Sequence, residues 1–123
     1  MKIRLTVGKL GFEAAHNLYG YKGDCSRLHG HSYKLCVTVE GNIDRNGFVL
    51  DFGWVKDVVK KNIIDVYDHQ YLNDMFDFNP TAENMTVNFA QTLDYVFSQH
   101  EGVKLISVKL WETEHNCAEV ILD

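Results

Sequence analysis

Alternating hydrophobic and polar positions predict two β-strands in the first third of the chain. The first strand begins with the alternation of residues 3–7. Gly8 and Gly11 interrupt this pattern, which resumes over residues 12–16 with the opposite parity, so we expect a β-bulge between two halves of one strand. A second alternating strand covers residues 31–39. A polar, glycine-bearing loop is expected between the two strands.

Helical spacing of apolar residues follows in the middle of the chain. The first predicted helix starts after Asp51, a suitable N-cap, and its apolar stripe consists of Phe52, Val55, Val58, Val59, Ile63 and Val66. Residues 68–80 are expected to form a loop. The second helix begins at Thr81, another N-cap residue, and stops at Gly102.

Two more alternating segments, residues 106–110 and 118–122, close the chain as strands. The order is therefore strand-strand, helix-helix, strand-strand. Strands do not alternate singly with helices, which argues against a doubly wound parallel sheet. We predict an α+β fold in which one antiparallel four-stranded sheet carries both helices on one face, as a single domain over residues 1–123.

Composition and charge narrow the function classes. An apolar content of 46% in 123 residues is typical of a folded soluble domain. The net charge of −5 argues against a nucleic-acid partner, because binding to a phosphate backbone requires excess lysine and arginine. No apolar run is long enough to span a bilayer, and the three cysteines are an odd number without an export signal, so we expect a cytoplasmic chain with free thiols.

The charge is nevertheless uneven along the chain. Residues 1–40 carry six basic and three acidic side chains, whereas the remainder is strongly acidic. A small anion would therefore bind most favourably near the first third of the chain, where Lys22 and Arg27 are candidate contacts.

Three histidines are the first candidates for chemistry. Residues two apart on a strand point to the same face, so the imidazoles of His29 and His31 converge. His16 ends the first strand on its buried parity. Three imidazoles at the ends of neighbouring strands suit a zinc ion with an open fourth position. The alternative for the His29–His31 pair is two hydrogen-bonded histidines in a turn.

Cys25 lies four residues before His29, and its role is open from spacing alone. It could be a fourth zinc ligand, which would make the site structural. It could instead be a reactive thiolate activated by the metal and by Arg27. A buried thiol without chemistry describes Cys36 and Cys117 better, because both lie within strands.

Two further acidic positions stand out. Asp68 precedes His69 directly, and an aspartate can orient an imidazole, although a solvated loop pair is the alternative. Glu112 continues the inward parity of the third long strand, which directs a carboxylate toward the core. Such a group needs a cation or several donors, for example the aminopyrimidinone edge of a pterin or guanine. The alternative is a frayed strand end with a solvated carboxylate.

Taken together, these motifs resemble the 6-pyruvoyl-tetrahydropterin synthase family, in its 6-carboxy-tetrahydropterin synthase branch. The resemblance runs almost end to end. It rests on the segments Phe12–His16, Cys25–Tyr33, Asp68–Asn73, Pro80–Asn84 and Trp111–Thr113. The three residues between Cys25 and the His-Gly-His motif resemble the 6-carboxy branch, because the animal 6-pyruvoyl enzymes have a longer insertion there.

The resemblance implies a role for each candidate residue. His16, His29 and His31 would bind zinc, and Cys25 would be the catalytic base. Asp68 and His69 would complete a proton relay, and Glu112 would anchor the pterin ring. Arg27 remains a candidate contact for the triphosphate.

The resemblance also implies a lyase reaction and an assembly. The substrate would be 7,8-dihydroneopterin triphosphate, converted to 6-carboxy-5,6,7,8-tetrahydropterin, acetaldehyde and triphosphate in queuosine biosynthesis. The fold would be the tunnelling fold, in which sheets of several subunits join into a barrel with active sites between subunits, here a homohexamer of two stacked trimers. Two alternatives stay open: a 6-pyruvoyl-tetrahydropterin synthase, and a non-catalytic Cys-His₃ zinc domain.

Overall fold

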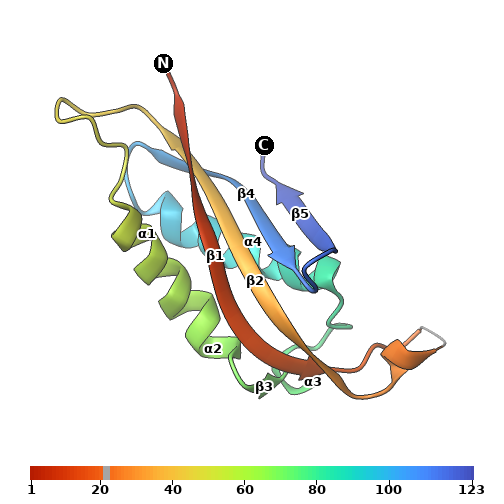
Figure 1. Ribbon diagram of the computed structural model, residues 1–123. Helices are drawn as coiled ribbons and strands as arrows, with labels where there is room; N and C mark the ends of the chain where they lie inside the picture. The colour runs from red at the N-terminus through yellow and green to blue at the C-terminus, as the bar shows by residue number, and fades with distance from the viewer. Residues whose placement is uncertain (21–22) are drawn as a thin grey trace.

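The computed structural model describes residues 1–20 and 23–123 and shows one β-sheet with helices on one face (Figure 1). The sheet has the strand order β3-β1-β2-β4-β5. Its strands are β1 (Ile3–His16), β2 (His29–Gly41), β3 (Gln70–Tyr71), β4 (Val103–Trp111) and β5 (Cys117–Ile121). The helices are η1 (Asp24–Ser26), α1 (Phe52–Val59), η2 (Lys60–Ile64), α2 (Asp65–Tyr67), α3 (Leu72–Met75) and α4 (Ala82–Ser98). The predicted α+β class is confirmed.

Strands β1 and β2 form a long antiparallel hairpin that curves across the molecule (Figure 1). Their register shifts between Val7 and Leu10, which confirms the bulge predicted at the glycines. Beyond the bulge, Phe12 and Ala14 face inward and are buried. The parity change therefore brings the end of β1, with His16, to the same face as the core.

The helices begin where the capping residues predict. The Asp51 carboxylate accepts a hydrogen bond from the backbone N–H of Trp54, and the Thr81 hydroxyl accepts one from Asn84. The first predicted helix is not regular, however, because it passes through the π-helical turn η2 between α1 and α2. The wider turn displaces the residues that follow it, among them Val66, which is 40% exposed. Phe52, the first residue of α1, is 54% exposed as well.

The core lies between the sheet and α1 and α4. Phe12 stacks on Tyr33 of β2 with ring centroids 4.9 Å apart, and Phe89 of α4 packs edge-on against Phe12 at 6.1 Å. In β4 a second register shift leaves Ile106 between two paired residues, so Leu105 rather than Ile106 joins the core cluster. The simple alternation predicted for residues 106–110 is wrong at this position, because a bulge reverses the parity.

Two details of the predicted topology are corrected. The sheet has five strands rather than four, because β3 pairs with β1 at Ala14 and Ala15, in parallel. Residues 68–80 are not all loop, since they contain β3 and α3. Both segments are too short to leave a periodic signal. The sheet is open within one chain, and no helix in the described ranges has the length and apolar character needed to cross a membrane.

Candidate metal centre and adjoining cavity

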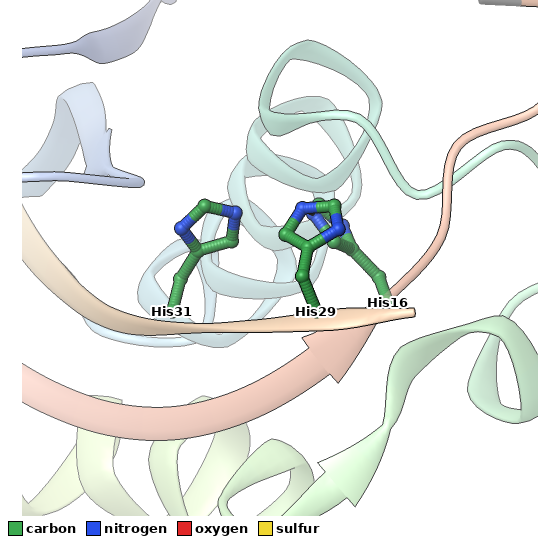
Figure 2. Close-up of side chains that lie close together, drawn as sticks. All are labelled: His16, His29 and His31. Atoms are coloured by element: carbon green, nitrogen blue, oxygen red, sulfur yellow. The ribbon is translucent and has the colours of Figure 1, made fainter. Parts of the chain in front are cut away.

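The three predicted histidines meet at one point on the inner face of the hairpin. In the β1–β2 register His16 lies opposite His29, and Ala14 lies opposite His31. The Nε2 atoms of His16 and His29 are 3.0 Å apart, and one ring nitrogen from each of the three histidines lies within 4.8 Å of the others. Figure 2 shows the three rings standing on the same side of the two strands. In the described part of the chain this group could hold a metal ion.

Backbone carbonyls orient two of the three rings. The Nδ1–H of His16 donates to the carbonyl of Pro80 at 2.8 Å, and the Nδ1–H of His29 donates to the carbonyl of Arg27 at 2.7 Å. In each ring this tautomer leaves an unprotonated Nε2 whose lone pair faces the centre of the group. The carbonyl partners therefore prepare two nitrogen ligands before any metal arrives.

Burial favours the neutral, metal-binding form of two of the rings, His16 and His31. Burial lowers the pKa of His16 and of His31, and the nearby Glu112 carboxylate only partly opposes this shift. Neutral imidazole is the ligating form. The Nε2 of His31 is buried without a hydrogen-bond partner, and such an atom is costly unless something binds it. Three converging imidazole nitrogens, one of them unpaired, fit a zinc ion with an open position.

Glu112 lies beside this group, as the strand parity predicted. It follows the end of β4, where its backbone N–H donates to the carbonyl of Asn116 at 3.0 Å. Its carboxylate is 3.9 Å from Nε2 of His16 and 3.8 Å from Nε2 of His31, too far for direct hydrogen bonds. A quarter of the side chain is exposed, so the carboxylate is accessible to a ligand as well as close to the metal group.

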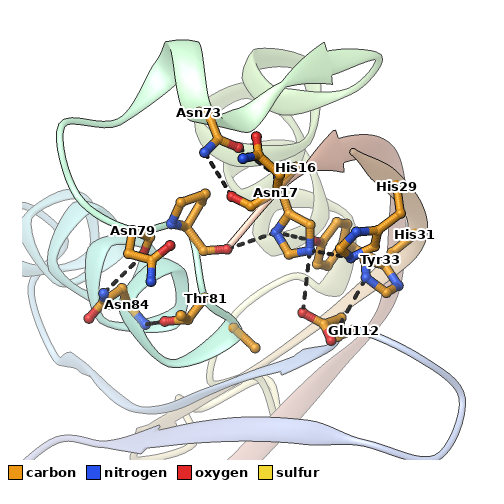
Figure 3. Close-up of polar contacts among 12 residues, drawn as sticks. His16, Asn17, His29, His31, Tyr33, Asn73, Asn79, Thr81, Asn84 and Glu112 are labelled. Atoms are coloured by element: carbon orange, nitrogen blue, oxygen red, sulfur yellow. Dashed lines mark hydrogen bonds and ion pairs between the residues drawn. The ribbon is translucent and has the colours of Figure 1, made fainter. Parts of the chain in front are cut away.

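A cavity of about 610 Å³ opens next to Glu112. Its wall combines Leu18 of the loop after β1, the start of α4 at Thr81 and Ala82, and Cys117 of β5. Figure 3 shows Thr81 and Glu112 on neighbouring elements around the histidines. The cavity places a carboxylate acceptor and a helix N-terminus around a space large enough for a bicyclic ring.

Cys25 is not one of the converging groups. It lies half-buried in η1, and its carbonyl accepts a hydrogen bond from the backbone N–H of Leu18 at 2.7 Å. The cluster able to hold a metal, searched among the described residues, consists of the three histidines without the Cys25 thiol. The geometry thus leaves the fourth ligand position to another group.

Asp68 and His69 lie together against the backbone of Glu13. The Asp68 carboxylate accepts from the backbone N–H of Glu13 at 2.8 Å and is 3.0 Å from Nδ1 of His69. The first of these bonds, followed by the His69 contact, lowers the pKa of Asp68. The His69 side chain is 78% exposed and lines a cavity with Glu13 and Ser32, which point outward from the sheet. His31 of the metal group lines the same cavity.

Two predicted anion contacts, Arg27 and Lys22, remain to be placed, and two residues that orient the site were not predicted. Arg27 is exposed, and the role visible for it is its carbonyl bond to His29. Lys22 lies outside the described residues. Sequence reasoning assigned no role to Pro80, whose carbonyl orients His16, or to Asn73, although both stand in motifs that carried the resemblance. Their place in those motifs was the one sequence feature that could have pointed to Pro80 and Asn73.

Comparison with known proteins decides the family. The family profile described as 6-pyruvoyl tetrahydropterin synthase matches residues 6–121. The chain belongs to this family. Membership makes it an enzyme of the lyase class, as the sequence predicted.

Relatives and solved structures of the family cover nearly the whole chain. A putative 6-carboxy-5,6,7,8-tetrahydropterin synthase of Archaeoglobus fulgidus is 32% identical over 123 residues, 98% of each chain. The 6-carboxy-5,6,7,8-tetrahydropterin synthase of Haemophilus influenzae is 30% identical, over 90% of this chain and 94% of its own. A dihydroneopterin monophosphate aldolase of Pyrococcus furiosus is 36% identical over 91% of both chains. The 6-pyruvoyl tetrahydropterin synthase of Caenorhabditis elegans shares the fold with a TM-score of 0.81 and 25% identity, covering 100% of this chain and 96% of its own.

Proposed function

We propose that the chain is a zinc-dependent 6-carboxy-5,6,7,8-tetrahydropterin synthase. It would convert 7,8-dihydroneopterin triphosphate to the carboxy-pterin, acetaldehyde and triphosphate, in the biosynthesis of queuosine. The observation that carries this proposal is the convergence of three imidazoles beside a cavity lined by Glu112. Relatives with this name, about 30% identical over nine tenths of the chain, supply the reaction.

His16, His29 and His31 would hold the zinc ion through Nε2. When bound, zinc supplies a Lewis acid that acidifies the side-chain hydroxyls of the substrate. Glu112 would accept two hydrogen bonds from the amino and ring N–H groups of the pterin in the adjoining cavity. The carboxylate is close enough to the histidines to fix the pterin next to the metal.

Cys25 would take and return protons at the side-chain carbons of the substrate, and His69 oriented by Asp68 would serve as its partner. Since His69 faces outward in one chain, this relay requires a second copy to bring its His69 to the Cys25 side. The open sheet leaves edges for such an assembly. A cytoplasmic homohexamer of two stacked trimers, with Arg27 near the triphosphate, completes the proposal.

A second candidate is an aldolase that cleaves the side chain of a dihydroneopterin monophosphate. The observation in its favour is the 36% identity with the relative of that name over nine tenths of both chains. Zinc, Cys25 and Glu112 could serve either reaction. A 6-pyruvoyl product is the third outcome within the same family.

Product analysis separates these candidates. The purified zinc-loaded protein is incubated separately with dihydroneopterin triphosphate and with dihydroneopterin monophosphate, and the products are identified by mass spectrometry. Acetaldehyde with a carboxy-pterin from the triphosphate supports the proposal. Pyruvoyl-pterin supports the 6-pyruvoyl activity, and cleavage restricted to the monophosphate supports the aldolase. No turnover of either substrate at full zinc occupancy would sink the proposed reaction.

A further inference from the structure

Two asparagine side chains pair with the backbone immediately after His16. The Asn73 amide accepts from the N–H of Asn17 at 2.9 Å and donates Nδ2–H to the carbonyl of the same residue at 2.8 Å. The Asn79 amide repeats this with Tyr19, accepting at 3.2 Å and donating at 2.7 Å. Figure 3 shows Asn73, Asn79 and Asn84 grouped beside the histidines.

The two side-chain amides form, with the residues after β1, the hydrogen bonds that a neighbouring strand would otherwise form. In an extended chain, backbone groups of residues two apart point to the same edge, and Asn17 and Tyr19 are two apart. A primary amide offers the same donor and acceptor pair as a peptide group. Asn73 and Asn79 therefore occupy the places of two peptide groups of a neighbouring strand, and each satisfies both backbone groups of its partner.

The opposite edge of the same segment carries Cys25. We call the pairing of Asn73 and Asn79 with the backbone of residues 17 and 19 the asparagine clamp. Leu18 lies between these two residues, and its N–H donates to the carbonyl of Cys25 at 2.7 Å. The Leu18 side chain also lines the cavity beside Glu112. The position of Cys25 relative to the cavity thus depends on a segment that the two asparagines fix.

The clamp is itself tied to the metal site. Asn84 donates Nδ2–H to the carbonyl of Asn79 at 2.9 Å, and the neighbouring carbonyl of Pro80 accepts from the ring of His16. One short segment before α4 therefore orients a histidine of the metal group and anchors the loop that bears the cysteine.

We propose that Asn73 and Asn79 are positioning residues that hold Cys25 in register with the metal group. This inference rests on the proposed function, in which Cys25 is the proton-transfer group. Neither asparagine contacts the substrate in this assignment. Their effect is on the rate of the chemical step through the placement of Cys25.

Asn73→Asp and Asn79→Asp test the clamp with little change in volume. Each variant keeps the acceptor for the backbone N–H but sets a carboxylate oxygen against the partner carbonyl, where Nδ2–H had donated. We expect kcat to fall about 10- to 100-fold, because a misplacement of about 1 Å costs that much. KM and zinc content should stay within about twofold, since Glu112 and the histidines are untouched. Asn62→Asp is the matched control, because Asn62 donates Nδ2–H to the carbonyl of Val58 at 2.8 Å, within the helical segment from α1 to η2.

A second readout does not depend on turnover. The alkylation rate of Cys25 is compared with that of the exposed Cys117 in the same chain, by peptide mass spectrometry after a short iodoacetamide pulse. The Cys25-to-Cys117 ratio should rise severalfold in both asparagine variants and stay unchanged in Asn62→Asp. An unchanged ratio, or loss of zinc together with activity, would overturn the positioning role. If the wild-type chain fails to turn over the pterin substrate, the alkylation ratio still decides whether the clamp exists.

Discussion

The unpaired Nε2 of His31 predicts that replacing this residue changes the free energy of unfolding in opposite directions without and with zinc. This nitrogen is buried without a hydrogen-bond partner, and the closest carboxylate oxygen, on Glu112, is 3.8 Å away. The ring packs edge-on against Tyr33 at 5.5 Å and against His29 at 4.8 Å. Replacing His31 with Phe keeps an aromatic ring in these contacts and removes the unpaired nitrogen.

Two opposing contributions set the stability difference between His31→Phe and the wild type. A buried polar atom without a partner costs about 1–3 kcal/mol, whereas the slightly larger ring adds an overpacking cost of about 1 kcal/mol at a site where the side chain is 16% exposed. Without zinc, His31→Phe should therefore be as stable as the wild type or more stable by up to about 2 kcal/mol. With free zinc at about 100 times its dissociation constant, the wild type gains about 2.7 kcal/mol and the variant lacks one of three ligands. The stability order then reverses.

Urea unfolding followed by circular dichroism, at one protein concentration, measures both states. Each protein is unfolded once with a chelator and once with buffered zinc, and the midpoints are compared at equal slope. His115→Phe is the control, because His115 is 80% exposed, pairs with Glu114 and is not one of the three histidines of the metal group. An equal zinc gain in His31→Phe and wild type would refute His31 as a ligand. A variant destabilised by more than about 1 kcal/mol in chelator would refute the cost assigned to the unpaired nitrogen.

Three further substitutions test the roles of single side chains. Cys25→Ala should abolish turnover and retain zinc, measured by metal analysis, and a variant that no longer holds zinc would contradict the catalytic-base role. Glu112→Gln should weaken substrate binding at least tenfold in calorimetry with zinc unaffected, because a neutral amide cannot accept both pterin hydrogen bonds; unchanged affinity would remove Glu112 from the site. Asp68→Asn should lower stability above the ordinary aspartate pKa of about 3.9, and the deficit should vanish as the pH falls through the lower folded pKa of Asp68. Urea midpoints between pH 7 and pH 3 check this, and a deficit that persists at the lowest pH would contradict the link to the carboxylate.

Much of the fold was predictable because it rests on local patterns. The alternation of apolar and polar residues predicted both strands of the hairpin, and Gly8 and Gly11 indicated the register shift after Val7. The capping residues Asp51 and Thr81 marked both helix starts. The errors lie where a local irregularity changes the period: η2 within the first helix, and the bulge at Ile106 in β4. No single residue type marks either irregularity in the sequence.

The parts of the candidate site that follow from the alternation of side chains along a strand were predictable. Same-face spacing brought His29 and His31 together, and the inward parity of β4 aimed Glu112 at them. The groups that orient the ligands were not predictable in the same way. Pro80 acts through its carbonyl on a residue 64 positions earlier, and Asn73 acts on a backbone 56 positions earlier. Such contacts leave no period in the sequence, and backbone groups carry no residue-type signal.

The chain places its proposed acid-base groups on different surfaces, and this explains which parts of the site a single copy can form. The histidines and Glu112 lie on the inner face of the sheet, where burial lowers the pKa of His16 and of His31. Asp68 and His69 lie against the backbone of Glu13 at the edge of β1, where His69 is mostly exposed. In the proposed assignment, metal binding and pterin recognition would need only one folded chain, whereas the proton relay would need contact between copies. Dilution that separates the copies should accordingly abolish turnover before it releases zinc.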